Sequence, residues 1–178
     1  MKVFTPELME PHFQALEKCR GVAQEDFHHP EGDVFTHTLQ VLARAFKETN
    51  DTDLILAAML HDVGKSIESH GHEQIAIEML DEYISAKTKW LIEQHMRIRI
   101  LLKGEMKKLS KVQELVEHPF LPDLILLARW DKMGRNPNKI VKYDREDIMS
   151  KLNKCVERRF EQLIPRERAN HENNPTTI

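Results

Sequence analysis

The segment AAMLHDVGKS, residues 57–66, joins the end of an apolar run to a histidine and an aspartate that stand side by side. Residues 54–60 are apolar throughout, which is the pattern of a helix buried on most of its sides. His61 and Asp62 follow this run, and Gly64 is the residue type that commonly ends a helix. An aspartate behind such a helix is costly to bury unless it is paired or binds a metal ion. The segment therefore predicts a core helix that ends at a chemically active site.

Helical periodicity extends over nearly the whole chain, and no segment shows the sustained alternation expected of a strand. Asp33, Asp123 and Asp144 are expected to cap helices, and Ser110 with Gln113 forms a capping-box pattern. The expected helices cover residues 35–46, 54–60, 75–84, 90–102, 110–116, 124–133 and 148–163. The sequence thus predicts an all-α protein, a compact single-domain helical bundle of about seven helices.

Length and composition favour one globular domain. The 178 residues are 40% hydrophobic and 31% charged, which is unlike a disordered chain. The formal net charge of -3 excludes a global basic field, and no extended nucleic-acid surface is evident. We expect the domain to span residues 1–166 and the polar tail at 167–178 to be frayed.

The sequence also points to the cytoplasm. Cys19 and Cys155 are far apart and form no CxxC motif, which suits two buried thiols in a reducing compartment. No apolar run approaches the roughly 18 residues of a membrane span, and the start of the chain lacks the apolar region of a signal peptide. We therefore expect a cytoplasmic protein without a membrane segment.

Four side chains could form a metal site with two nitrogen and two oxygen ligands. His37, His61, Asp62 and Asp131 lie on three expected helices or at their ends. Imidazole and carboxylate ligands suit Mn, Fe, Co, Ni or Zn, and Mg is a further candidate. Each residue also has a structural alternative, since a histidine can bond a carbonyl group and an aspartate can form an ion pair. The convergence of several such residues is what favours the metal site.

Four segments in this order resemble the HD-domain phosphohydrolases: HPEGDVFTHTL (29–39), LHDVGK (60–65), HGHE (70–73) and ARWDKMGR (128–135). The pattern is most similar to the HD domain of bacterial CCA-adding tRNA nucleotidyltransferases, and it covers residues 27–136. The resemblance implies a helical bundle, a divalent metal ion held by the H…HD…D residues, and phosphohydrolase activity. The sequence has no Gly-Gly-x-x-Arg-Asp segment of a nucleotidyltransferase head, so we do not expect it to add nucleotides to RNA.

Two further histidines leave the number of metal ions open. In members of the wider family with two ions, later histidines hold the second ion and the aspartate bridges. His72 and His95 could serve in this way with Asp62, at the usual separation of about 3.5–4 Å between ions. We favour one ion, with His72 and His95 lining the pocket as contacts to the substrate or as a general acid.

Basic side chains near these segments are candidates for binding phosphate. Lys65 lies one helical turn after His61, and Arg135 belongs to the last of the four segments. Arg97 is the further candidate, but Arg97 and Arg99 point to different faces of one helix, so at most one reaches the pocket.

The expected reaction is hydrolysis of phosphomonoester or phosphodiester bonds by metal-activated water. Asp62, Lys65, His72 and His95 are the candidate catalytic residues. The resemblance implies nucleotides or nucleic-acid ends as substrates, and phosphatase, nucleotidase or 2′,3′-cyclic phosphodiesterase activity. The alternatives are a nucleoside triphosphate hydrolase, a metal-stabilised nucleotide-binding module without turnover, and a purely structural helical scaffold. Apolar residues on the last helix are compatible with a homodimer.

Overall fold

The computed structural model describes residues 3–25 and 27–164, so the tail predicted at 167–178 lies outside the described residues. In this part of the chain there are eight α-helices and two short 3₁₀ turns, with no strand. The α-helices are α1 (Pro6–Glu17), α2 (Val34–Glu48), α3 (Thr52–Leu60), α4 (His72–Leu80), α5 (Ala86–Leu102), α6 (Leu109–Val116), α7 (Leu121–Met133) and α8 (Arg145–Leu163). The 3₁₀ turns are η1 (Val63–Ser66) and η2 (Asp81–Tyr83). The predicted all-α class is confirmed.

The helix missing from the sequence-based expectation is α1. Thr5 caps it by accepting a hydrogen bond from the backbone N–H of Leu8, and Pro6 occupies the first turn, where its missing N–H is harmless. Phe13 and Leu16 lie in the core. A proline inside a helix normally weakens it, yet α1 continues through Pro11.

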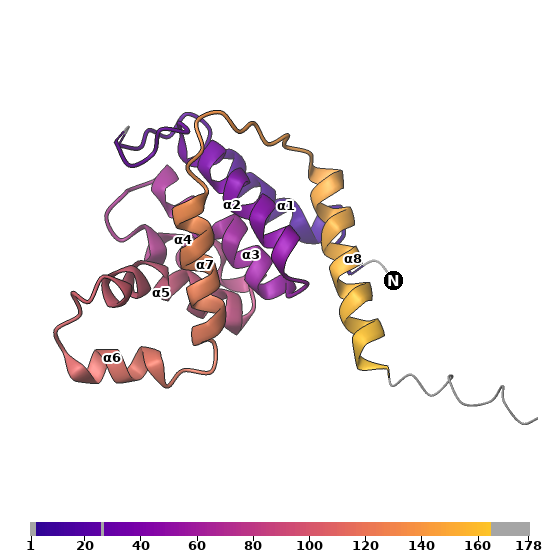
Figure 1. The fold of residues 1–178 in the computed structure, drawn as a ribbon. Coiled ribbons are helices and arrows are strands. Elements are labelled where there is room, and N and C mark those ends of the chain that lie inside the picture. The colour runs from indigo at the N-terminus through magenta and orange to yellow at the C-terminus, as the bar shows by residue number, and fades with distance from the viewer. Residues whose placement is uncertain (1–2, 26, 165–178) are drawn as a thin grey trace, which may run out of the picture.

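Helix α3 lies at the centre of the fold. It contacts α1, α2, α5, α7 and α8, and residues 54–60 are all buried, as the apolar run predicts. Figure 1 shows α3 behind α2 and α7, with α8 along one edge of the molecule and α6 at the opposite edge. A helix held on so many sides fixes the direction of the residues at its end. None of the described helices has the length and apolar character needed to cross a bilayer.

Two predicted caps are confirmed. The side chain of Asp33 accepts a hydrogen bond from the backbone N–H of Thr36 at 2.8 Å. That of Asp144 accepts from the N–H groups of Glu146 and Asp147. These bonds satisfy N–H groups that have no partner within the helix.

Two other predicted caps are wrong. Helix α6 begins before Ser110, with Lys108 at its cap position and no side-chain cap, so the box with Gln113 does not form. Helix α7 begins before Asp123, whose carboxylate instead forms an ion pair with Lys87 at 2.6 Å. In both cases the helix begins before the polar residue that was predicted to cap it.

Candidate metal centre

Six side chains meet where α3 ends, and all are almost completely buried. Each has a relative exposure of 5% or less. They are His37 on α2, His61 and Asp62 after α3, His72 at the start of α4, His95 on α5 and Asp131 on α7. The structure thus brings together all the metal-ligand candidates of the sequence, including His72 and His95, the possible ligands of a second ion.

A glycine allows two of these elements to meet. Gly64 lies in η1, just after Asp62, and faces the first residue of α4. A Cβ atom at Gly64 would lie 1.9 Å from the carbonyl oxygen of His72, far inside contact distance. The absence of a side chain therefore lets the start of α4 approach Asp62.

The carboxylate of Asp62 faces two groups of histidines. Its Oδ2 atom lies 3.5 Å from Nε2 of His61 and 3.9 Å from Nε2 of His37. Its Oδ1 atom lies 3.1 Å from Nε2 of His72 and 3.6 Å from Nε2 of His95. Asp62 is therefore shared between two clusters of ligand atoms, each with two imidazole nitrogens.

Asp131 completes the first cluster. Its Oδ1 atom lies 2.9 Å from Nε2 of His37 and 3.9 Å from Nε2 of His61. The Nε2 atom of His61 is buried and has no hydrogen-bond partner among the described residues. Burial lowers the pKa of His61 to about 4, although the charges of Asp62 and Asp131 act in the opposite direction. His61 is therefore neutral at pH 7, and its bare nitrogen lone pair faces two carboxylates, which suits a metal ion.

Backbone carbonyl groups orient three of the rings. The Nδ1 atoms of His61, His72 and His95 bond the carbonyl oxygens of Ala58, Ser69 and Ile92 at 3.0, 2.9 and 2.6 Å. A carbonyl oxygen only accepts hydrogen bonds, so each Nδ1 carries the proton and each neutral ring presents an Nε2 lone pair to the centre. Such a hydrogen bond from Nδ1 holds a metal-binding histidine in the tautomer that leaves Nε2 free for the metal ion.

The second cluster needs a cation between its rings. The Nε2 atoms of His72 and His95 lie 3.0 Å apart. Since Nδ1 is the protonated nitrogen in both neutral rings, two lone pairs would face each other at this distance. A proton or a metal ion between the two nitrogens removes the repulsion.

His37 is oriented by a buried carboxylate. Its Nδ1 atom lies 2.8 Å from Oε1 of Glu31 and 2.9 Å from the carbonyl oxygen of Gly134. Nδ1 of His29 donates to the same Glu31 oxygen at 2.9 Å, and the Glu31 side chain is 0% exposed. Burial lowers the pKa of His37, but hydrogen bonds to Asp131 and Glu31 outweigh it and raise the pKa to about 9. The surrounding carboxylates therefore favour a positive charge at this position.

A cavity of about 570 Å³ opens beside the centre. His72, Lys65 and Arg99 line it. Lys65 donates to Oδ2 of Asp62 at 2.8 Å, and a guanidinium nitrogen of Arg99 lies 3.9 Å from Oδ2 of Asp131. The cavity is thus wide enough for a small anion and has cations on the wall next to the candidate ligands.

Arg135 also reaches the centre. Its Nη2 atom lies 3.9 Å from Oδ1 of Asp131, and its buried Nε–H has no hydrogen-bond partner within residues 3–25 and 27–164. An unsatisfied guanidinium donor at this depth is available to an anionic group.

The structure does not bring Arg97 to the centre. Its guanidinium group donates to Gln94 at 2.7 Å and to Glu114 at 3.3 Å, on the side of α5 that faces α6. Arg99 lines the cavity instead. The spacing contained this signal, because Arg99 is four residues after His95 and therefore shares its helix face, whereas Arg97 is only two residues after it.

Fold and site together define a class of protein: an all-helical domain with a buried histidine and aspartate cluster that fits a divalent metal ion. The comparison with known families agrees. The HD domain family matches residues 34–136, which is more than half of the chain, and the chain belongs to this family.

Curated relatives match a shorter part of the chain. The Multifunctional CCA protein of Thioalkalivibrio sulfidiphilus is 36% identical over 75 residues, which are 38% of this chain and 18% of that protein. The protein of the same name from Methylococcus capsulatus is 40% identical over 76 residues, 39% of this chain and 18% of its own. The protein of the same name from Teredinibacter turnerae is 33% identical over 74 residues, which are 38% of this chain and 18% of that protein. The match thus spans about a fifth of the length of these relatives.

Proposed function

We propose that the protein is a metal-dependent phosphohydrolase that cleaves phosphomonoester or phosphodiester bonds of nucleotides or nucleic-acid ends. The observation that carries this proposal is the Asp62 carboxylate, which faces two imidazole nitrogens with each of its oxygens. A buried carboxylate shared in this way suits cations on both sides. The adjacent cavity, with its basic wall, gives an anionic substrate access to the same position.

The proposed ligands of the first ion are His37, His61, Asp62 and Asp131. Three of the four have relative exposures of 2% or less, and Asp131 has 5%. Their donor set of two imidazole nitrogens and two carboxylate oxygens fits Mn, Fe, Co, Ni or Zn better than Mg, which prefers oxygen ligands. A divalent ion bound here would supply Lewis acidity toward the phosphate and activate a water molecule for attack.

A second ion between Asp62, His72 and His95 is part of the proposal. The sequence favoured one ion, with His72 and His95 lining the pocket. The 3.0 Å separation of their Nε2 atoms and the 3.1 Å distance from His72 to Asp62 instead favour a cation held by all three residues. A metal content of two ions per chain, reduced to one in His72→Gln, is the expected result. A content of one ion in both proteins would contradict this part of the proposal.

Three cationic side chains are proposed to hold the phosphate. Lys65 and Arg99 lie on the cavity wall, and Arg135 has an unsatisfied buried N–H. Guanidinium groups bind two phosphate oxygens at once, and an ammonium group adds a compact charge. Together they would stabilise the charge that gathers on the phosphoryl oxygens during hydrolysis.

The choice of nucleotides or nucleic-acid ends rests on the relatives. Each of these relatives is named Multifunctional CCA protein. The similarity to this chain is confined to 74–76 residues. Phosphatase, nucleotidase and 2′,3′-cyclic phosphodiesterase activities all need the same phosphate-binding parts. We therefore propose the class of substrate and leave the preferred bond to experiment.

Phosphate release from stripped protein tests the proposal. Mn, Co, Ni, Zn or Mg would be returned to chelator-treated protein, which is then offered nucleoside monophosphates, 2′,3′-cyclic nucleotides and nucleoside triphosphates. Cleavage of the cyclic substrates would be followed by chromatography of the products. Turnover that depends on metal and is lost in Asp62→Asn would support a phosphohydrolase.

The matched control is Asp53→Asn, which changes an aspartate at the opposite end of α3 and should keep full activity. If folded wild-type protein binds a metal ion but shows no turnover with any substrate, the proposal fails. A nucleotide-binding module without turnover then becomes the better description.

A further inference from the structure

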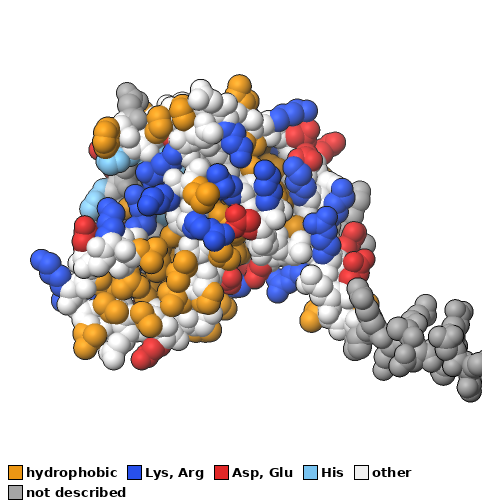
Figure 2. Space-filling view, in the orientation of Figure 1, with side chains coloured by type: hydrophobic (Ala, Val, Ile, Leu, Met, Phe, Trp, Pro, Cys, Tyr) orange, Lys and Arg blue, Asp and Glu red, His pale blue; other side chains and the backbone are white. Residues whose placement is uncertain are grey.

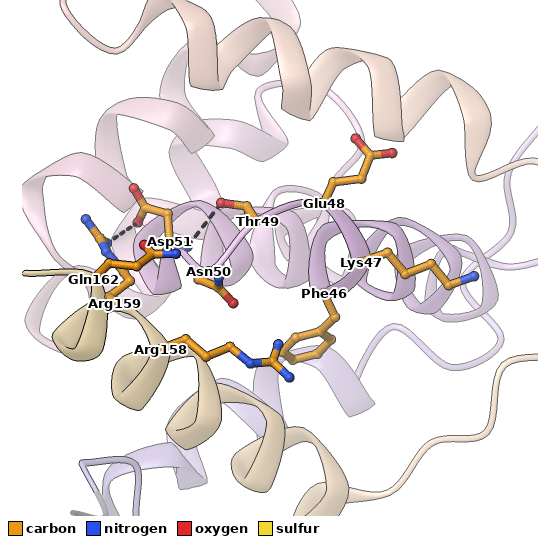
Figure 3. Close-up of a pocket in the computed structure, with 9 residues that line it drawn as sticks. All are labelled: Phe46, Lys47, Glu48, Thr49, Asn50, Asp51, Arg158, Arg159 and Gln162. Carbon is orange, nitrogen blue, oxygen red and sulfur yellow. Dashed lines mark hydrogen bonds and ion pairs between the residues drawn. The ribbon is translucent and has the colours of Figure 1, made fainter. Parts of the chain in front are cut away.

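A groove separates the end of α2 from the exposed side of α8, away from the metal centre. It consists of two adjoining hollows of about 430 and 380 Å³, both lined by Phe46, Lys47 and Arg158. The first hollow reaches Lys151 and the second reaches Gln162, so the groove follows α8 for roughly 16 Å at the helical rise of 1.5 Å per residue. Figure 3 shows Arg158 extending along the second hollow toward the ring of Phe46. We call this feature the α2–α8 groove.

Three cations of the groove have no counterion in the part of the chain that the structure describes. Among the described residues, Lys47, Lys154 and Arg158 have neither an ion pair nor a hydrogen bond from the side chain. All three are exposed, and they belong to two helices that face each other. Their charges therefore act together on whatever enters the groove.

The acidic side chains at the groove do not neutralise these cations, because other partners hold them. Asp51 forms ion pairs with Lys87 at 2.7 Å and Arg159 at 3.3 Å. Glu48 accepts a hydrogen bond from the indole N–H of Trp130 at 2.8 Å and pairs with a neighbouring arginine. The groove keeps a positive field although the whole chain carries a formal net charge of -3.

The shape of the groove suits a single strand of nucleic acid. At about 3.4 Å per nucleotide of a stacked strand, its length accommodates four or five phosphates. The ring of Phe46 is half-buried in the wall, with the ammonium group of Lys151 5.7 Å from its centre, so both an aromatic surface and cations are present. Cations along a trough with an aromatic ring form the usual platform for single-stranded nucleic acid. A flat membrane surface could not enter between two helices.

Further cations lead from the groove toward the metal centre. His37 and Lys47 are ten residues apart on α2, which corresponds to about 15 Å. Arg44 and Lys139 lie between them. Burial lowers the pKa of Lys139, and so do the nearby charges of Lys47 and Arg44. The side-chain amide of Gln40 on α2 donates to the carbonyl oxygen of Lys139 at 3.0 Å and holds this loop against α2. Figure 2 shows Lys and Arg side chains gathered in a band across this face, from the edge with the histidines toward α8.

We propose that the α2–α8 groove binds the sugar-phosphate backbone of single-stranded nucleic acid and so positions the end of the strand at the metal centre. The groove would make the protein prefer an oligonucleotide end over a free nucleotide. The binding part stands on the groove alone, whereas the positioning part rests on the proposed phosphohydrolase function.

Binding is tested with charge reversal at these three cations of the groove. The variant carries Lys47→Glu, Lys154→Glu and Arg158→Glu. The control makes the same change in charge at exposed lysines in and before α6, with Lys107→Glu, Lys108→Glu and Lys111→Glu. Fluorescence anisotropy would follow an unstructured RNA dodecanucleotide with a blocked 3′ end, at several salt concentrations, and circular dichroism would verify the fold.

We expect the groove variant to bind the RNA at least tenfold more weakly and the control to bind as the wild type does. The slope of log affinity against log salt should fall by about 2 in the groove variant, since each lost phosphate contact contributes about 0.7 for a single strand. Equal binding by the groove variant and the wild type would overturn the proposal. So would an equal loss in the control, because the attraction would then be non-specific.

Turnover separates this inference from the proposed function. The groove variant should hydrolyse a mononucleotide at the wild-type rate and lose most of the preference for an oligonucleotide end. Unchanged preference would refute the positioning role while phosphohydrolase activity stands. RNA binding that is lost in the groove variant, in a protein without turnover on any substrate, would support the groove and refute the proposed function.

Discussion

The backbone at Gly64 lies so close to the carbonyl group of His72 that a Cβ atom would be 1.9 Å from the oxygen and 2.8 Å from the carbon. The contact joins the turn after α3 to the first residue of α4. It therefore sets the distance between Asp62, two residues before the glycine, and the His72 ring, whose Nε2 atom is 3.1 Å from the Asp62 carboxylate.

Gly64→Ala is expected to damage both stability and metal binding. The clash is with backbone atoms, so α4 has to move, at a cost of about 1–3 kcal/mol in the free energy of unfolding. Movement of α4 carries His72 away from Asp62. Urea denaturation and a metal titration measure the two effects. The neighbouring Ile67→Ala, at a side chain that is 66% exposed, should change neither quantity much. Wild-type stability and affinity in Gly64→Ala would show that α4 adapts without strain.

Glu31→Gln is expected to weaken metal binding through His37. The substitution keeps the size of the side chain but removes the negative charge that faces Nδ1 of His37 at 2.8 Å. Loss of such an orienting partner usually costs about 10–100-fold in metal affinity. Competition with a chromogenic chelator would measure the affinity, and Glu25→Gln on the exposed loop provides the control. An unchanged dissociation constant would mean that the carbonyl group of Gly134 alone orients the ring.

Two arginines on one helix give a matched test of the substrate-binding wall. Arg99 lines the cavity beside the centre, whereas Arg97 is bound to Gln94 and Glu114. We expect Arg99→Ala to reduce kcat/KM by roughly tenfold, the usual effect of losing a charge-assisted hydrogen bond. Arg97→Ala should retain wild-type kinetics. The reverse result would mean that the substrate approaches from the side of α6.

The ion pair between Glu17 and Arg145 should make stability depend on pH in acid. The hydrogen bond from Arg145 lowers the pKa of Glu17 from 4.5 to about 2, and the hydroxyl of Tyr143 donates to the same carboxylate. Because the pKa is lower in the folded state, the stabilisation is complete above pH 4.5 and is lost as the pH falls toward 2.

Glu17→Gln should therefore be less stable than wild type at pH 7 by about 1–2 kcal/mol, allowing for solvent screening. The difference should shrink as the pH approaches 2, and urea denaturation at several pH values would follow it. The exposed Glu78→Gln on α4 is the control. A difference that stays constant between pH 7 and pH 2 would contradict the assigned role of the carboxylate.

The sequence predicted the helical class and the convergence at the centre because both depend on strong local signals. An apolar run that ends in His61 and Asp62 leaves few alternatives for the helix or for its polar end. Helix starts were less certain, since a polar residue such as Asp123 is as suitable for an ion pair as for a cap. Helix α1 was not predicted, and it contains Pro11, a residue type that normally ends a helix.

Features that depend on tertiary contacts could not be predicted in this way. The carboxylate of Glu31 orients two histidines only because its loop folds over the start of α2. The α2–α8 groove takes Lys47 and Arg158 from positions more than one hundred residues apart. Local patterns contain no information about which distant cations lie side by side.

The central position of α3 restricts how the length of this segment can change. Asp51 caps its first turn beside the groove, and His61 follows its last turn at the metal centre. Each residue of a helix advances it by about 1.5 Å and turns it by about 100°. One inserted or deleted residue between Asp51 and His61 would therefore point the histidine at a different neighbouring helix. Related sequences should vary here by substitution among apolar residues, while the spacing between the cap and the histidine stays constant.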